Sequence, residues 1–453
     1  MTGAPTPQHP VVVVGAGPTG LAAAAHLLER DLEVVVLERG EQAAAAVRSW
    51  GHVRLFSPWS ELVDPAARRL LEPRGWTAPD PGGYPTGADW AARYLQPLAD
   101  ALGDRVRYGV TVTGVARRGR DRVVDAGRED EPFTVHARLA DGTGSRLTAA
   151  AVVDASGTFS DPNPLGGDGY PADGEAEAAS LLGHRVPDQG APADVERHGG
   201  RRTAVVGAGH SALTAIVALT AIAEQVPGTE VVWVLRRGGV GNAFGGGDAD
   251  ELPARGALGQ RARAAVESGR VEVVTGFRTA AVEQHDGTVT LVSEDGARVE
   301  RLDRVVTLTG FRPNLAMLEE VRLDLDERLQ APVRLAPLID PNVHSCGTVY
   351  PHGAAELAHP AEPGLYVVGM KSYGRAPTFL ALTGFEQVRS VAAALAGDHE
   401  AAGRVELTLP ETGVCGGAGL FDPDKDASGG CCAPVSPQTF QLVPLGQGAA
   451  SAR

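Results

Sequence analysis

The stretch that decides the fold is residues 11–20, VVVVGAGPTG. Its four valines predict a short buried strand, and Gly15, Gly17 and Gly20 follow in G-x-G-x-x-G spacing. The first glycine permits a tight turn, the second leaves room for a pyrophosphate, and the third lets the next helix pack closely on the strand. That helix is expected over residues 21–30, with its N-terminus directed at the phosphates.

A second strand is expected over residues 33–37, and it leads into Glu38, where a carboxylate can accept hydrogen bonds from a ribose diol. One G-x-G-x-x-G among 58 glycines would be weak evidence, but strand, glycines, helix, strand and acid in this order are specific. The pattern therefore predicts a bound dinucleotide. Its candidate binding residues are Gly15, Gly17, Pro18, Thr19, Gly20, Glu38, Arg39 and Trp59.

The overall composition narrows the possible partners. The chain has 453 residues, a net charge of −15 and four cysteines. The negative charge argues against nucleic acid or an anionic membrane surface as a partner. No signal peptide and no membrane-spanning segment is expected, and the sparse cysteines favour a cytoplasmic location.

The region after the first motif predicts a loop and a small sheet. Residues 50–87 are irregular and rich in Trp, Pro and Gly, so they either cover a cofactor or form an aromatic surface loop. Residues 89–102 read as an amphipathic helix. Three alternating segments, 106–116, 133–139 and 145–151, then predict a β-meander. Residues 152–157 predict another buried strand that ends in a small-residue turn.

A second dinucleotide motif follows a Pro- and Gly-rich connector, residues 166–200. It reads GAGHSA, a G-x-G-x-x-A fingerprint between a strand and a helix, and the acid expected after the next strand is replaced by two arginines. Two guanidiniums suit the 2′-phosphate of NADPH, whereas the alternative is a pair of solvated arginines. The candidate residues are Gly207, Gly209, His210, Ser211, Ala212, Arg236 and Arg237.

Two dinucleotide sites in one chain are most economically filled by NADPH as electron donor and FAD as acceptor. After the second site the chain is expected to return to the first domain through a small-residue turn at Gly310 and a buried strand ending at Gly369. The predicted fold is α/β, with an FAD domain interrupted by an NADPH domain, a small β-meander and a disordered C-terminal tail. The expected segments are 10–165 and 305–397 for FAD, 166–200 as connector, 201–304 for NADPH and 398–453 as tail.

Over residues 10–397 the sequence resembles the two-dinucleotide-binding flavoproteins, and within them the flavin-containing monooxygenase superfamily. The matching stretches are GAGPTGL from Gly15, GAGHSA from Gly207 and the T-G-x-x-P-N turn at residues 309–314. The resemblance implies hydride transfer from NADPH to FAD, followed by a flavin C4a-hydroperoxide formed with molecular oxygen that oxidises a soft, small-molecule nucleophile.

Two family features are missing. The F-x-G-x-x-x-H signature is absent before the second motif, although Phe159 and His184 occur at another spacing. The family's Gly-Asp contact to the flavin ribitol is also absent, because Met370 and Lys371 follow Gly369. Lys371 is a candidate catalytic residue that would stabilise reduced flavin, and the alternative is a surface lysine.

Cysteine placement separates this chain from dithiol reductases. It has no C-x-x-x-x-C in the first domain and no C-x-x-C in the second, so electrons are expected to pass to oxygen or to a substrate on the flavin. The alternatives are an NADPH-dependent flavin reductase of a thiol-bound metalloid without oxygenation, and a metalloid-binding or redox-sensing flavoprotein.

Three of the four cysteines lie in the glycine-rich tail, as Cys415, Cys431 and Cys432. Soft thiolates select thiophilic ions, and three of them on a flexible arm suit a trivalent arsenical. The spacing also resembles the cysteine tails of arsenic-resistance flavoproteins. The alternative is an unstructured tail whose cysteines have no function.

Overall fold

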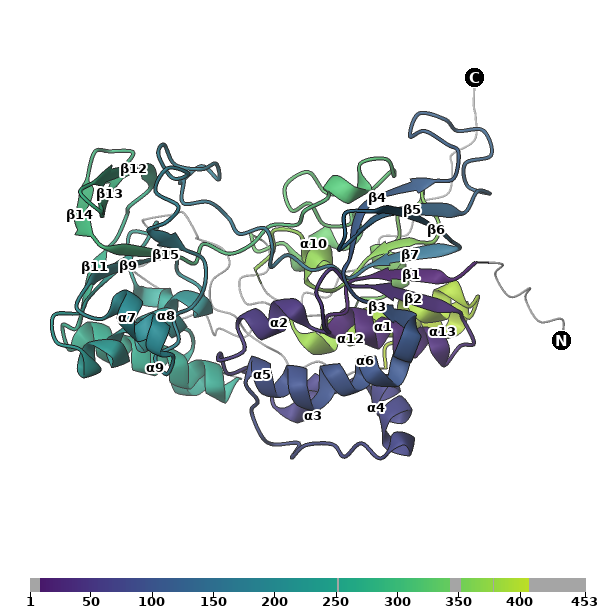
Figure 1. Ribbon diagram of the computed structural model, residues 1–453, viewed down its shortest axis with the longest axis horizontal. Helices are drawn as coiled ribbons and strands as arrows, with labels where there is room; N and C mark the ends of the chain where they lie inside the picture. The colour runs from purple at the N-terminus through teal and green to yellow at the C-terminus, as the bar shows by residue number, and fades with distance from the viewer. Residues whose placement is uncertain (1–8, 251, 343–351, 378, 407–453) are drawn as a thin grey trace, which may run out of the picture.

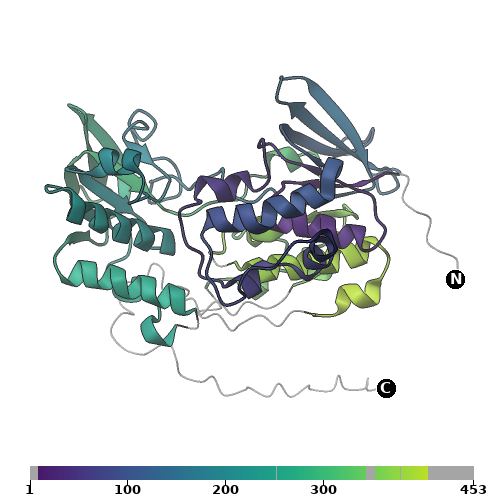
Figure 2. The ribbon, with the colours of Figure 1, turned by 60° about the horizontal axis from the view of Figure 1, so that its bottom comes forward.

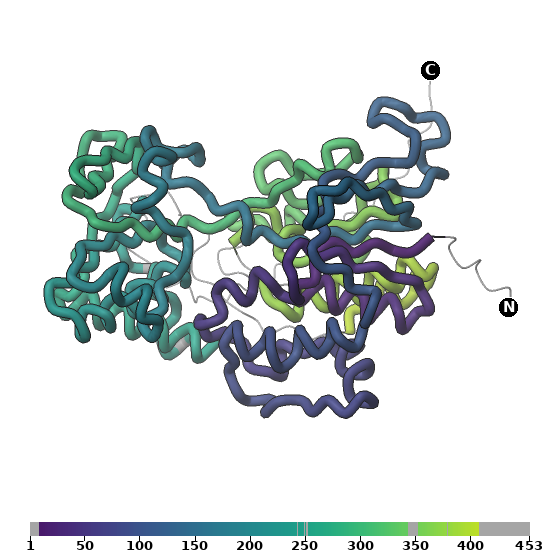
Figure 3. Tube along the Cα trace, in the orientation of Figure 1, coloured from purple at the N-terminus to yellow at the C-terminus, as the bar shows by residue number. Residues whose placement is uncertain are grey.

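The computed structural model describes residues 9–250, 252–342, 352–377 and 379–406. They form two lobes, and the chain passes from the first to the second and back (Figure 1). The tube in Figure 3 shows that the purple N-terminal segment and the yellow-green C-terminal segment share one lobe. The predicted interruption of one α/β domain by another is therefore confirmed.

The first lobe is built on a five-stranded parallel sheet in the order β16-β7-β1-β2-β3. Its strands are β1 Val11–Val14, β2 Val34–Leu37, β3 Val106–Arg107, β7 Ala151–Asp154 and β16 Leu365–Val367. All four residues of β1 are buried, because it lies at the centre of the sheet with both faces covered.

Alternate valines of β1 face two different layers. Val11 and Val13 pack in the cluster that contains helices α1 (Pro18–Leu28) and α12 (Ala381–Leu395). Val12 and Val14 pack in the cluster that contains the predicted meander. The meander is an antiparallel sheet of β4 Val110–Arg117, β5 Phe133–Leu139 and β6 Gly144–Ala149. Smaller helices complete the lobe: α2 Ala45–Ser49, α3 Trp59–Leu62, α4 Pro65–Leu71, α5 Gly87–Trp90, α6 Gln96–Leu102, α10 Ala336–Ile339 and α11 Ala354–Leu357.

The second lobe repeats this plan. Its parallel sheet has the order β11-β10-β9-β15-β8, with helices packed on one face and an antiparallel sheet on the other. Figure 2 shows the helices of this lobe below its sheets. The main elements are β9 Arg202–Val206, α8 His210–Gln225, β10 Glu230–Val234, α9 Pro253–Glu267, β11 Val271–Val274, β12 Thr279–His285, β13 Thr288–Ser293, β14 Arg298–Leu302 and β15 Arg304–Thr307.

Three segments predicted to be irregular contain regular structure. Residues 50–87 include the short helices α3 and α4. Within the connector, β8 (Leu182–Gly183) pairs with β15, and α7 (Pro192–His198) lies beside α8. The tail does not begin at residue 398 as expected, because α13 (His399–Gly403) packs on α12. There the Arg389 guanidinium donates to the Ala401 carbonyl at 2.8 Å.

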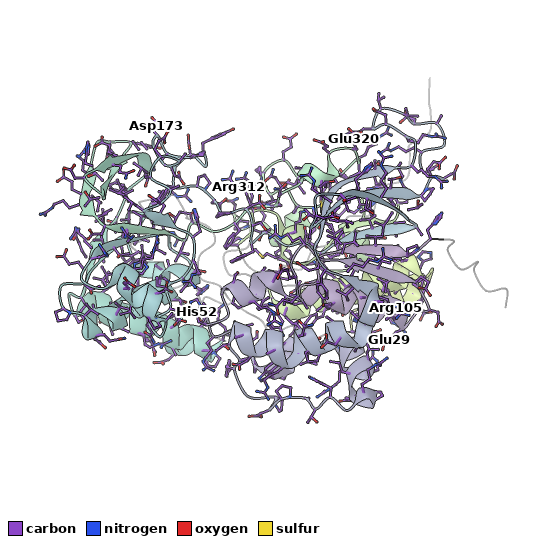
Figure 4. The ribbon with its side chains drawn as sticks, viewed as in Figure 1. Glu29, His52, Arg105, Asp173, Arg312 and Glu320 are labelled. Atoms are coloured by element: carbon purple, nitrogen blue, oxygen red, sulfur yellow. The ribbon has the colours of Figure 1, made fainter. Side chains whose placement is uncertain are left out.

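The two crossings between the lobes are bonded to each other. The side-chain amide of Asn163 donates to the Thr309 carbonyl at 3.0 Å, and the Thr309 hydroxyl donates to the Asn163 carbonyl at 2.7 Å. The Phe159 and Phe311 rings lie 5.3 Å apart in the same place. Arg312, also in this region, lies between the lobes in Figure 4. No helix in the described part of the chain is long and apolar enough to cross a membrane.

Candidate functional site

A cavity of about 1770 Å³ contains both glycine turns in its wall. From the first turn it is lined by Gly15, Gly17, Pro18 and Thr19, and from the second by Gly207, Gly209, His210 and Ser211. The carboxyl ends of both parallel sheets meet at this cavity, which is where α/β proteins bind dinucleotides.

The first turn has the geometry that its sequence predicts. Gly15 has a φ of +99°, and a Cβ there would lie 2.9 Å from the Ala155 carbonyl oxygen. A Cβ on Gly20 would lie 2.0 Å from the Gly15 carbonyl oxygen, so this glycine allows α1 to pack tightly. A Cβ on Gly17 would have no neighbour within 4 Å and would extend into open space. Since no side chain caps α1, its N-terminal amides remain available to an anion, and this cradle fits the pyrophosphate of FAD.

Glu38 lies at the end of β2 and lines the cavity, as predicted. Its carboxylate is buried and accepts hydrogen bonds from the Ala16 amide at 2.7 Å and the Gly40 amide at 2.8 Å. These bonds fix the carboxylate against the turn, in the position expected for a ribose. The neighbouring Arg39 also lines the cavity, where it donates to the Ser160 hydroxyl.

The second turn has the same plan. Gly207 has a φ of +137°, and a Cβ there would lie 2.2 Å from the Leu308 carbonyl oxygen. A Cβ on Gly209 would again meet nothing within 4 Å. Ala212 is fully buried and does not line the cavity, which agrees with a packing role. No side chain caps α8, so its first amides can bind the second pyrophosphate.

Arg236 and Arg237 follow β10 and both line the cavity. Arg236 donates to the Gly167 carbonyl at 3.3 Å. Burial, with Arg237 and Arg278 nearby, lowers the pKa of Arg236 from its usual value. Adjacent guanidiniums that disfavour each other's charge are stabilised by an incoming dianion, so this position fits the 2′-phosphate of NADPH.

His210 connects the second turn to the first lobe. Its ring meets the Phe56 ring edge-on, with 5.4 Å between centroids. Burial, followed by the charge of Arg255, lowers the pKa of His210 to about 4. The imidazole is therefore neutral near pH 7, and Phe56 with its neighbour Val53 packs against the core of the second lobe.

The structure does not support the prediction that Trp59 binds a cofactor. Its side chain is buried at the start of α3, and the Arg93 guanidinium lies 5.5 Å from its ring centroid. It belongs to the core of the first lobe and is not part of the cavity wall. Residues 53–57 of the same loop do line the cavity, so the prediction selected the wrong part of the segment.

Lys371 is buried, so the surface-lysine alternative is wrong. Its ammonium lies 2.7 Å from an Asp154 carboxylate oxygen and 3.1 Å from the Ser156 hydroxyl. Only 2% of Lys371 is exposed and none of Asp154. The cation lies at the carboxyl end of β7 and lines the cavity, with its charge balanced by Asp154.

Gly310 and Gly369 both line the cavity and both have positive φ angles, +91° and +69°. A Cβ on Gly369 would lie 3.0 Å from the Thr19 hydroxyl, so this glycine lets β16 and its following turn approach α1. Phe159 and His184, which occur at the wrong spacing for the monooxygenase signature, also line the cavity.

Sequence reasoning missed Asp154 and Asn163. Asp154 ends a buried strand, two residues before Ser156. A buried acid needs a charged or hydrogen-bonding partner, and here the partner, Lys371, is far away in the sequence. No group of three or more His, Cys, Asp or Glu side chains that could hold a metal is found in the described part of the chain. Cys415, Cys431 and Cys432 lie outside the described residues.

Comparisons with known proteins identify the architecture. The model of the pyridine nucleotide-disulphide oxidoreductase family matches residues 12–335. Among curated proteins, the rice (Oryza sativa subsp. japonica) indole-3-pyruvate monooxygenase YUCCA1 is 37% identical over 107 residues, or 23% of this chain and 24% of that protein. The rice mitochondrial electron transfer flavoprotein-ubiquinone oxidoreductase is 32% identical over 133 residues, 24% of this chain and 23% of that protein. The matches thus span about a quarter of these relatives' lengths.

Solved structures share the fold over most of the chain. The bacillithiol disulfide reductase of Bacillus cereus has a TM-score of 0.61 and 18% identity, covering 86% of this chain and 99% of its own. The flavin-containing monooxygenase of Stenotrophomonas maltophilia has a TM-score of 0.53 and 22% identity, covering 86% and 98%. At these identities the likeness supports the fold alone.

Proposed function

Since the chain belongs to the pyridine nucleotide-disulphide oxidoreductase family and uses FAD and NADPH, we propose that it is a monooxygenase of a soft, small-molecule nucleophile. The observation that carries the proposal is the composition of the cavity between the two turns. None of its described lining residues is a cysteine. The described wall thus offers no dithiol to accept electrons from the flavin, and we propose that the electrons pass directly to oxygen and substrate.

The residues of the chain would bind and orient the two cofactors. The N-termini of α1 and α8 would hold the pyrophosphates, Glu38 a ribose, and Arg236 with Arg237 the 2′-phosphate. The chemistry that FAD supplies when bound is acceptance of a hydride from NADPH and reaction of its reduced form with oxygen.

Two further features of the wall would support that chemistry. Val53 and Phe56 bridge to the second lobe and would help to keep water out of the cavity. The Lys371 ammonium is held by hydrogen bonds to Asp154 and Ser156, so the Lys371–Asp154 ion pair would present a fixed dipole near the first turn. A role of Lys371 in stabilising reduced flavin is part of this proposal.

Measurement of NADPH oxidation and oxygen uptake tests the proposal. With a simple sulfide or amine, or with methylarsenite, we expect oxygen uptake stoichiometric with NADPH oxidation and an oxygenated product. Turnover of the substrate under anaerobic conditions would instead support a flavin reductase. The absence of any turnover would support a metalloid-binding or redox-sensing protein.

A trivalent arsenical is the finer substrate proposal, and it rests on the three tail cysteines. A tethered ligand reaches an effective concentration of roughly millimolar when its linker spans the gap. Because α13 packs on α12, the informative truncation removes residues 407–453 and leaves the helix intact. We expect a raised KM for methylarsenite with unchanged FAD content, and the same result from Cys431→Ser with Cys432→Ser. An unchanged KM in both would exclude the cysteines from substrate capture. We also propose a cytoplasmic location, because the chain contains few cysteines.

A further inference from the structure

Two arginines of the cavity wall are not explained by the phosphates of FAD and NADPH. Arg54 and Arg375 both line the cavity and are exposed, yet neither belongs to a glycine turn or follows β10. Arg54 donates to the Tyr84 carbonyl, and Arg375 donates to the Gln330 side-chain oxygen at 2.8 Å. Both acceptors are uncharged, so these bonds orient the guanidiniums without neutralising them.

An acid that interacts electrostatically with Arg54 is already engaged by other groups. Asp89 feels the charge of Arg54, but its Oδ2 accepts hydrogen bonds from the Thr86 amide at 3.0 Å and the Thr86 hydroxyl at 2.7 Å. Among the described residues, no carboxylate lies within ion-pair distance of Arg54 or Arg375. This contrasts with Arg255 and Lys371 in the same wall, each of which has a buried aspartate partner.

Arg54 and Arg375 both line the cavity, and each lies in a segment that leads into one of two helices in contact. Arg54 precedes α3 in the chain and Arg375 precedes α12, and these two helices pack against each other. The segments that lead into them also supply the aromatic part of the wall. The aromatic lining residues of these segments are Phe56, Tyr373 and Phe379.

We infer that the substrate carries a carboxylate or a similar anionic group on an aromatic or otherwise apolar body, and that Arg54 and Arg375 bind the anion. Guanidiniums form paired, charge-assisted hydrogen bonds with carboxylates, and the adjoining rings would accept the apolar body. The two guanidiniums would attract the anion only at short range. At longer range the whole chain, with a net charge of −15, repels anions. This inference rests on the proposed monooxygenase function alone. It names a substrate class other than the arsenical, because methylarsenite is uncharged near neutral pH and offers no anion to Arg54 and Arg375.

Binding of two matched probes to the oxidised holoenzyme tests the inference. The probes are 4-(methylthio)benzoate and its neutral isostere 4-(methylthio)benzamide, followed by flavin absorbance and tryptophan fluorescence. We expect the benzoate to bind at least tenfold more tightly than the amide, and Arg54→Gln or Arg375→Gln to remove most of that preference. Arg105→Gln is the matched control, since Arg105 is exposed on the outer side of the first lobe (Figure 4).

Equal binding of the two probes, or a benzoate preference that survives in both variants, would overturn the inference. Oxygen uptake in the same preparations reports the proposed function separately. Oxygenation of both probes without a preference for the anion would overturn the inference and leave the monooxygenase proposal standing. Selective benzoate binding without oxygen uptake would overturn the monooxygenase proposal and leave the anion subsite standing.

Discussion

The two glycine turns share one backbone plan but differ where each helix approaches its turn. In the first turn Gly20 leaves no room for a side chain, because a Cβ would lie 2.0 Å from the Gly15 carbonyl oxygen. In the second turn the corresponding residue is Ala212, whose Cβ is present and fully buried. The second helix therefore leaves space for a methyl group that the first does not.

A second difference lies at the end of the strand that follows each helix. Glu38 ends the first unit and is held by backbone amides, whereas Arg236 and Arg237 end the second. The residue beside the first turn is therefore negatively charged, whereas the residues beside the second turn are positively charged. On the proposed assignment, the glycine turns would bind the pyrophosphates, and the residues after the next strand would select which dinucleotide binds.

The largest expected effect comes from valine at the central glycine of each turn. Gly17→Val places a branched side chain in the open space meant for a pyrophosphate, so the protein should fold but lose its flavin, with at least a hundredfold weaker FAD binding. Gly209→Val should abolish NADPH binding in the same way while FAD remains. Flavin absorbance and NADPH titration measure both effects.

The Gly17→Val and Gly209→Val variants together test which turn binds which cofactor. Normal FAD content in Gly17→Val, or loss of FAD in Gly209→Val, would mean that the turns are assigned to the wrong cofactors. Circular dichroism controls for folding, since neither new Cβ meets another atom within 4 Å.

The third glycine position should distinguish the two turns by stability. Gly20→Ala forces a methyl group against backbone, and such overpacking costs typically about 1–3 kcal/mol. Ala212→Gly should cost about 1 kcal/mol, from helix propensity alone. Denaturant unfolding measures both changes, and an unperturbed Gly20→Ala variant would contradict the close packing of α1 on its turn.

Much of the fold could be predicted from the sequence because its strongest signals are local. Valine runs, glycine spacing and alternating strands predicted both parallel sheets and the meander. The two-residue strand β8 could not be predicted, since Leu182 and Gly183 have no periodicity and form a strand only by pairing with β15. Likewise α13 depends on its contacts with α12, and Trp59 is in the core because of tertiary packing.

The parts of the candidate site that are formed by the backbone of the glycine turns could be predicted. The parts that depend on side chains pairing across the fold could not. Gly15, Gly207 and their neighbours line the cavity as expected. Lys371 could not be placed from sequence, because its partner Asp154 lies 217 residues away. Long-range pairs of this kind leave no spacing signal in a single sequence.

Acid should weaken the second lobe through a histidine that lacks a carboxylate partner. In the first lobe His26 lies 2.9 Å from the Asp64 carboxylate, whereas His198 of the second lobe lies 3.2 Å from the Thr203 hydroxyl. Burial, followed by the charge of Arg197, lowers the pKa of His198 to about 4. The unfolded chain therefore takes up this proton first, and stability that is complete above pH 6.5 is lost as pH falls towards 4.

Calorimetry at several pH values measures this loss. By pH 5 we expect His198 to account for about 1–2 kcal/mol of lost unfolding free energy. His198→Gln should show a smaller decrease in Tm between pH 7 and pH 5 than the native protein. An identical decrease in both would assign the acid sensitivity to other groups.

A coenzyme comparison sharpens the contrast between Glu38 and the arginine pair. Charge-assisted contacts contribute about 1.5–3 kcal/mol, so Arg236→Ala with Arg237→Ala should lower kcat/KM for NADPH at least tenfold. NADH lacks the 2′-phosphate, so its kcat/KM should stay nearly constant and serves as the internal control. FAD content should also be unchanged, because both arginines follow β10 in the second lobe. An equal loss with both coenzymes would mean that the arginines support the fold of that lobe rather than recognise a phosphate.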